Sequence, residues 1–549
     1  MAKKSRTTNT VFNTFAGFGA KGINIVTTFI MRSVFIYTLG IEYSGISGLF
    51  TDILTMLSFA ELGISSAIAY SLYKPVAQGD YRKIAALMDF YKKAYRVVAG
   101  VVMGAGLCVI PFLKYLVPAE KIDPAIRTQI MSQLVFIYVL YLANSAVSYL
   151  LIYKSTLLNA YQEGRVISNI QFVMSIVRVI IECIILFSFT WTKNCFIIYL
   201  IVGIFLTITQ NIIISRMASK RHPEMNQYPE ERLSKEEKNK LFTDVRALML
   251  YKLCTAVNNS IDSGIISTLC GSVWVGYLSN YRAVSSKLLS LFKQFFASVL
   301  PSTGNLAAES NEEKQHRTFR TMLFLTFWVS CFCTTGLIVL LNPFVDIWLG
   351  GKYVKTFWIV FSLALVFYLC AIENPISTFR LSNGIFKEGK YRPLAMLIIN
   401  VIASVGFAIL FRNYFGARYG DEFGSAMGVV GVKLATCLAH ISTLIWFDPW
   451  LVYKHVFKRS VMEYFKVFGI YALVTTGCCV LTYALGALLP FESKWLTFII
   501  KLIMVTVISN GAVILIFRNT REYKDSVAIF KNILNKIKKK KNKLAKANG

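Results

Sequence analysis

The run LTFIIKLIMVTVISNGAVILIF, residues 496–517, contains a single charged side chain, Lys501. A helix needs about 20 mostly apolar residues to cross the hydrocarbon core of a bilayer, so this run predicts a membrane span. Similar runs recur along the chain, and we expect about fourteen spans. Their approximate ranges are 9–38, 44–73, 95–117, 129–152, 165–189, 194–215, 243–269, 273–302, 319–342, 356–381, 393–411, 425–447, 463–488 and 496–517.

The composition also excludes an ordinary soluble protein. Of the 549 residues, 55% are hydrophobic and only 16% are charged, whereas soluble domains have about 25% charged residues. Most of the 11 Cys lie inside apolar runs without the spacing of a disulfide framework or a metal site. We therefore expect an all-α polytopic membrane protein in which the cysteines pack as small core residues, with no metal and no cofactor.

The net charge of +30 is explained by membrane topology. Lys and Arg gather in the N-terminal segment, in alternate connections and in the tail after Arg518, which predicts that these parts are cytoplasmic. Both termini then lie in the cytoplasm, in agreement with an even number of spans. The charge does not form a stripe on a soluble fold, so nucleic acid is not an expected partner. The Lys538–Lys541 run is either a contact for anionic lipid or a solvated tail.

A charged connection with two prolines, SRMASKRHPEMNQYPEERLSKEEKNK at 215–240, separates the sixth and seventh spans. The first span of each half contains a similar segment. These segments are FIMRSVFIYTLG at 29–40 and NSIDSGIISTLC at 259–270. Such internal similarity is typical of duplicated transporter folds. The expected organisation is an N-terminal lobe 1–216, a linker 217–242, a C-terminal lobe 243–447, two further helices within 448–517 and a basic tail 518–549.

Several basic residues fall inside the predicted spans. A charge at the bilayer centre costs at least about 2.5–3.5 kcal/mol, so such residues usually face a polar cavity. Lys21 and Arg32 are 11 residues apart and share one helix face, and Arg282 and Lys293 repeat that spacing. These four residues and Lys252 of the seventh span are the five predicted substrate-binding residues. The alternative is that their side chains reach out to the membrane interfaces. This alternative applies most to Arg32, which lies close to the external end of its predicted span.

Buried carboxylates provide predicted sites for a coupling proton or sodium ion. The three candidates are Glu61, Asp262 and Glu373. Glu373 lies seven residues before Arg380, on the same helix face and beside Pro375, which predicts a kink. Arg178 and Glu182 are four residues apart and are expected to neutralise each other as a structural pair, with a functional role as the alternative.

Motifs for catalysis are absent from the sequence. It has no H-E-x-x-H, C-x-x-C or Walker A pattern, and the G-x-G-x-x-G match at 17–22 lies inside the first span rather than in a βαβ unit. Lysine and arginine in a water-accessible cavity between the two halves suit an anionic head group such as a lipid-linked diphosphate. Long helices without a catalytic cluster therefore indicate transport rather than an enzyme.

Residues 37–84 also resemble a known family. The pattern L-G-x-E-Y-x-G-I-x-G-L-F at 39–50 and the runs SFAELGI at 58–64 and SLYKP at 71–75 are similar to bacterial polysaccharide transporters, the oligosaccharide-lipid flippases of the multidrug/oligosaccharidyl-lipid/polysaccharide (MOP) exporter superfamily. The resemblance implies two lobes of six helices around a central cationic cavity, with two additional C-terminal helices. It also implies alternating access that moves undecaprenyl-diphosphate-linked oligosaccharide across the bacterial cytoplasmic membrane, and a polymerase and chain-length machinery as partners.

Three alternatives remain open. A multidrug antiporter of the same superfamily would export organic cations and should have an acidic cavity, whereas this chain has more basic than acidic candidates. A membrane-embedded glycosyltransferase or polymer ligase should have a large external catalytic loop, and the expected external loops are short. A lipid II or teichoic-acid flippase would differ only in its cargo.

Overall fold

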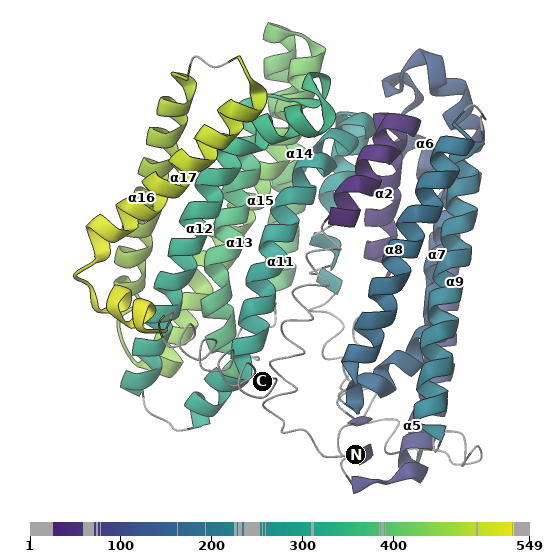
Figure 1. The fold of residues 1–549 in the computed structure, drawn as a ribbon, viewed down its shortest axis with the longest axis horizontal. Coiled ribbons are helices and arrows are strands. Elements are labelled where there is room, and N and C mark those ends of the chain that lie inside the picture. Colours follow the sequence, from purple (N-terminus) through teal and green to yellow (C-terminus); the bar gives the residue numbers. More distant parts are fainter. Residues whose placement is uncertain are drawn as a thin grey trace, which may run out of the picture. The chain divides into compact units, whose positions relative to one another are not determined.

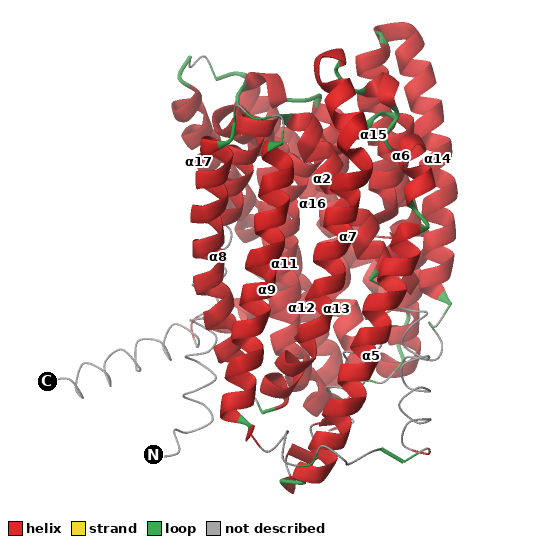
Figure 2. Cartoon of the chain, turned by 90° about the vertical axis from the view of Figure 1, so that its right-hand side faces the viewer, coloured by secondary structure: helices red, strands yellow, loops and turns green. Residues whose placement is uncertain are grey.

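The computed structural model consists of helices joined by short connections, and the residues that it describes contain no strand (Figure 2). Ten of the described helices are long and apolar enough to cross a membrane: α5, α7, α8, α9 and α12 to α17. The protein is therefore an all-α, multi-pass membrane protein. The described residues are 26–58, 71–72, 75–76, 78–161, 163–190, 192, 194–223, 228, 233–234, 236, 253–254, 256–258, 260–308, 312–383, 385, 389, 391–489, 492–529 and 531.

The other four predicted spans are not among these ten helices. The predictions 9–38, 44–73 and 243–269 each include residues outside the described part. The prediction 273–302 matches α11 (Ser272–Ala308), which is long enough to span but carries Arg282, Lys287 and Lys293. These charges lower its mean hydropathy, as expected of a helix that lines a polar region rather than facing lipid.

The chain forms two compact units, Met1–Ser279 and Asn280–Gly549. In the first unit α7 is central, because α2, α5, α8 and α9 all pack against it. The Asp123 side chain caps the first turn of α7 by accepting a hydrogen bond from the Ala125 N–H at 2.9 Å. Phe50 and Tyr138 meet edge to face in the core between α2 and α7. The bounds are Val26–Leu39 for the first described helix, Ile41–Leu57 (α2), Tyr81–Leu107 (α5), Leu113–Leu116 (α6), Pro124–Ala160 (α7), Gly164–Ser188 (α8) and Cys195–Arg221 (α9).

In the second unit α12 packs against α13, α16 and α17, and α15 packs against α13 and α14 (Figure 1). The α14 and α15 helices form a tight hairpin around Gly420, whose φ of 91° favours glycine. Gly416 and Gly424 then let the two backbones touch. The bounds are Glu312–Leu349 (α12), Phe357–Ser382 (α13), Arg392–Tyr419 (α14), Asp421–Val452 (α15), Tyr453–Phe457 (η5), Met462–Ala487 (α16) and Lys494–Phe517 (α17).

Candidate functional site

The first feature of the site is a close crossing of α2 and the start of α11. A Cβ atom added at Gly45 would overlap the backbone carbonyl of Ser272, and one added at Gly276 would lie 2.6 Å from the carbonyl oxygen of Ile41. Both positions therefore need glycine, because any side chain would push the two backbones apart. The crossing brings Ser44 of α2 and Ser279 of α11 close to Arg32, which lies on the helix Val26–Leu39.

Arg32 is held at this crossing by three groups from two other helices. Its Nη2 donates to Ser44 Oγ at 2.9 Å, to the Gly276 carbonyl oxygen at 3.4 Å and to Ser279 Oγ. The guanidinium is thus fixed within the helices of the first unit by hydroxyl and carbonyl oxygens, none of which is a carboxylate.

A second arginine, Arg178 of α8, lines the same cavity. Its Nη2 donates to Thr207 Oγ1 of α9 at 2.8 Å and to the Gly203 carbonyl oxygen at 3.4 Å. Its Nη1 lies 3.8 Å from Oε1 of Glu182, which is buried. The spacing in the sequence correctly predicts this pair. The 3.8 Å separation is longer than a charge-assisted hydrogen bond, so the pair holds the guanidinium loosely on that side.

Together these side chains enclose a cavity of about 320 Å³, which we call the arginine pocket. Two guanidiniums and one carboxylate line it, so its charged lining has an excess of one positive charge. Hydroxyl groups supply most of the remaining polar surface. The lining residues are Thr27, Thr28, Met31, Arg32, Phe35, Ser44, Ser47, Ser175, Arg178, Val179, Glu182 and Tyr199.

The remaining predicted site residues have different placements. Lys21, Glu61 and Lys252 lie outside the described residues. Asp262 is buried, and the neighbouring Ser263 hydroxyl donates to Asp52 Oδ2 of α2. Arg282 and Lys293 both lie on α11, where an 11-residue spacing puts them on one face. Glu373 lies on α13 in the second unit, where its carboxylate contacts His440 of α15.

The second unit contains its own buried charges. Asp448 of α15 lies between two arginines: its Oδ2 pairs with Arg392 of α14 and lies 3.6 Å from Arg380 Nε of α13. All three side chains are almost fully enclosed, and they tie three helices together. The Glu373 to His440 distance, from Oε2 to Nδ1, is 3.3 Å. Within the described residues, no group of three or more His, Cys, Asp or Glu could hold a metal ion.

An apolar cavity of about 580 Å³ also lies in the second unit, among α12, α13, α15 and α16. Its wall is built from aromatic and aliphatic side chains with a few hydroxyls at one side. Representative members are Phe357, Trp358, Phe361, Ile445, Phe468 and Tyr483. Such a wall can bind a hydrocarbon chain but offers nothing for a charged head group.

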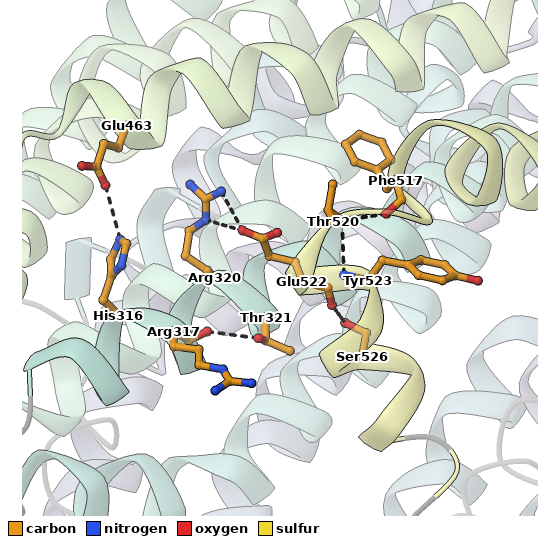
Figure 3. Close-up of polar contacts among 10 residues, drawn as sticks. All are labelled: His316, Arg317, Arg320, Thr321, Glu463, Phe517, Thr520, Glu522, Tyr523 and Ser526. Atoms are coloured by element: carbon orange, nitrogen blue, oxygen red, sulfur yellow. Dashed lines mark hydrogen bonds and ion pairs between the residues drawn. The ribbon is translucent and has the colours of Figure 1, made fainter.

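Ion pairs also join α12 to the segment that follows α17 (Figure 3). Arg317 pairs with both oxygens of Asp525 at 2.8 and 2.7 Å, and both nitrogens of the Arg320 fork contact Glu522 Oε1 at 3.0 and 2.7 Å. Hydrogen bonding to Arg317 lowers the pKa of Asp525. These contacts hold residues 521–529 against the first turns of α12.

These features define a multi-pass membrane protein with a cation-rich pocket among its helices. No protein-family model matches the sequence, and no curated protein sequence is similar to it. Comparison with solved structures shows that the fold is similar to the folds of two membrane transporters.

Two solved structures illustrate the likeness. A lipid II flippase, MurJ in an inward closed conformation, aligns with a TM-score of 0.62 at 14% identity, covering 93% of this chain and 99% of its own. A multidrug resistance MATE family transporter of the MOP superfamily, in an inward-facing conformation, aligns with a TM-score of 0.55 at 13% identity, covering 76% of this chain and 93% of its own.

The sequence does not indicate every member of these clusters. The spacing of Arg178 and Glu182 predicts their pairing but gives no sign that Arg32 lines the same cavity. The partners of His440, Arg392 and Asp448 lie on other helices, so spacing along the chain does not reveal these contacts. A buried histidine in an apolar run was the one signal available for His440.

Proposed function

We propose that this protein is a flippase that moves undecaprenyl-diphosphate-linked oligosaccharide across the bacterial cytoplasmic membrane by ion-coupled alternating access. The arginine pocket is the observation that carries the proposal. Guanidinium groups bind phosphate oxygens through paired N–H donors, and hydroxyl groups complete the hydrogen bonds of sugars and phosphates. Arg32 and Arg178 have donors in place and an excess positive charge to attract a diphosphate.

The net positive charge of the residues that line the arginine pocket argues against an organic cation as cargo. A cationic drug would enter a cavity that already has more positive than negative side chains, which costs Coulomb energy in a region of low dielectric constant. The MATE likeness concerns the fold alone, so it does not carry the multidrug function to this chain. A second function is therefore not proposed.

The apolar cavity of the second unit supports a lipid-linked cargo. A polyprenyl chain is a long hydrocarbon with no polar groups, and a wall of aromatic and aliphatic side chains binds such a chain by removing it from water.

The other predicted residues keep their proposed roles. Lys21, Lys252, Arg282 and Lys293 are proposed to bind the diphosphate or acidic sugars. Glu61, Asp262 and Glu373 are proposed coupling sites for a proton or sodium ion. We expect the polysaccharide polymerase and the chain-length machinery to receive the transported units.

The test measures the leaflet accessibility of a fluorescent undecaprenyl-diphosphate oligosaccharide in proteoliposomes, with and without a proton or sodium gradient. Wild-type protein should move the intact lipid. Arg32→Gln and Arg178→Gln should slow this movement by about tenfold or more, because a hydrogen bond to a charged group contributes about 1.5–3 kcal/mol.

Arg418→Gln is the matched control, since Arg418 is exposed on α14, where its Nη1 donates to the hydroxyl of the neighbouring Tyr414. Its transport rate should equal that of the wild type. Consumption of the lipid or transfer of its sugar would show an enzyme instead of a flippase. Wild-type rates in both pocket variants would remove the arginine pocket as the head-group site.

A further inference from the structure

Two charged contacts follow one another along α13 and α15. Glu373 meets His440, and seven residues later on α13 Arg380 meets Asp448, which lies eight residues later on α15. The contacts occur in the same order on both helices, so the helices run parallel. Both contacts lie between the facing sides of α13 and α15. The Arg380 contact also includes a second arginine, Arg392, whereas the Glu373 contact pairs a carboxylate with an imidazole, which can be neutral or protonated.

The His440 ring lies between two partners. Nδ1 is 3.3 Å from Glu373 Oε2, and Nε2 is 3.7 Å from the sulfur of Cys370. A neutral ring with its hydrogen on Nδ1 has that hydrogen on the atom nearest the carboxylate, and its Nε2 can accept the thiol hydrogen. A protonated ring also carries a hydrogen on Nε2, to which the sulfur can turn as acceptor. The site can therefore gain or lose one proton while both contacts persist.

The backbone of α13 is adapted to hold this carboxylate. Pro375 has no N–H, so the Ala371 carbonyl lacks its usual donor in the helix. The Asn374 side chain replaces that donor: its Nδ2 donates to the carbonyl oxygens of Ala371 at 3.0 Å and Cys370 at 2.8 Å. The break in the helix is thus hydrogen-bonded at the residue next to Glu373, which fixes where the carboxylate points.

Other ionisable side chains of the described residues lie around this pair. Against α13, α12 contributes the buried Cys331, and α16 contributes Tyr464, which is within electrostatic range of Glu373. Against α15, α14 contributes Arg392, which pairs with Asp448, and the apolar Met396 and Ile399 around Ala439. The other buried ionisable side chains on α13 and α15 themselves are Tyr368, Arg380, Lys433, Cys437 and Asp448.

We propose that Glu373 and His440 bind the proton that couples transport to a proton gradient, an inference that rests on the proposed transport function. A proton from water binds His440 Nε2, the Cys370 thiol rotates from donor to acceptor, and the charge of the pair changes from −1 to zero; release reverses each step. An uncompensated anion inside the membrane favours the conformation that exposes it to water, whereas a neutral pair tolerates enclosure.

The same atoms are a poor sodium site. Hard cations prefer several oxygen ligands, and here the carboxylate is faced by an imidazole nitrogen and flanked by a sulfur on the far side of the ring. The ring separates Glu373 from Cys370, so the three groups cannot converge on one ion. The coupling ion that this site selects is a proton.

The experiment measures the steady-state leaflet ratio of the fluorescent undecaprenyl-diphosphate oligosaccharide in proteoliposomes under a one-unit pH gradient. Wild-type protein should shift the ratio by up to about tenfold for one proton per lipid. Glu373→Gln and His440→Gln should abolish the shift while the lipid still equilibrates. His316→Gln is the matched control, since His316 forms a similar contact with Glu463, 3.6 Å away near the start of α12, and should retain the shift.

An independent measurement separates this proposal from the proposed function. Infrared difference spectra of the purified protein with isotope-labelled histidine, between about pH 5 and pH 8, should show one histidine that titrates together with a carboxylate, and the paired signal should vanish in both variants. Retention of the gradient-driven shift in both variants, or absence of the paired signal from the wild type, overturns the proton site. If the wild type moves no lipid, the flippase function fails and the infrared signal alone decides the site.

Discussion

Gly45 and Gly276 set the position of Arg32 by allowing two backbones to touch. Gly45→Ala would put a methyl group onto the Ser272 carbonyl, so α2 and the start of α11 would have to separate. We expect a loss of about 1–3 kcal/mol in stability, the usual cost of overpacking. Thermal unfolding in nanodiscs measures it.

Gly48→Ala is the control for this change. Gly48 lies on the same helix, and its added Cβ would lie 3.5 Å from Val275 Cγ1, an ordinary contact. Alanine is also favoured over glycine inside a helix by about 0.5–1 kcal/mol. A melting temperature at or above the wild type is expected for Gly48→Ala, and an equal loss in both variants would show that the crossing is not the cause.

Asp448 neutralises two buried arginines at once. Asp448→Asn would leave Arg380 and Arg392 enclosed without a counter-charge, and breaking a buried pair in this way costs about 3–5 kcal/mol. Thermal unfolding should show a large decrease. Asp421→Asn, at the exposed start of the same helix, should cost less than about 1 kcal/mol; equal effects would refute the assignment of Asp448 as the tie between three helices.

At the scale of elements, the segment 521–529 depends on its ion pairs with α12. The Asp525 pKa is lower when folded than when unfolded, so the pair stabilises docking at neutral pH and this contribution is lost as pH falls through the folded pKa. Asp525→Asn should imitate that loss at neutral pH. We expect faster hydrogen exchange across 521–529, relative to intrinsic rates, in the variant and in the wild type at acidic pH.

Arg518→Gln provides the comparison, because Arg518 is exposed at the end of α17. Exchange in 521–529 should then match the wild type. Slow exchange in Asp525→Asn would mean that apolar contacts, such as the stacking of Tyr523 on Trp328, hold the segment without the ion pairs.

The helices themselves were largely predictable, because apolar runs of spanning length have no alternative in a bilayer. Ten predicted spans correspond to the ten long apolar helices of the described part. The α11 helix shows the limit: hydropathy alone does not mark it, because it carries Arg282, Lys287 and Lys293. Side-chain pairs within one helix, such as Arg178 with Glu182, were also predictable because helix geometry fixes which residues are neighbours.

At the scale of the whole molecule, the proposed transport function requires charged faces that act in more than one conformation. Arg282→Ala with Lys293→Ala removes the cationic face of α11, and we expect loss of polymer export with normal membrane insertion, because the diphosphate would lose part of its attraction. Export in cells and insertion by surface labelling measure the two effects separately.

Lys287→Ala is the control on the same helix. Lys287 lies about 140° around α11 from Arg282, so it belongs to another surface. Export should stay at the wild-type level in this variant. Normal export from the double variant would count strongly against a substrate role for the α11 face.

The sequence by itself determined that the chain is a multi-pass helical membrane protein with basic residues inside its spans, since bilayer thickness and the cost of buried charge act on each segment separately. Only the tertiary structure decided which charges share a site. Arg32 lines one pocket with Arg178, 146 positions later in the chain, and Glu373 meets His440 on another helix. Contacts between helices depend on how close their backbones come, and glycines such as Gly45 and Gly276 set that distance.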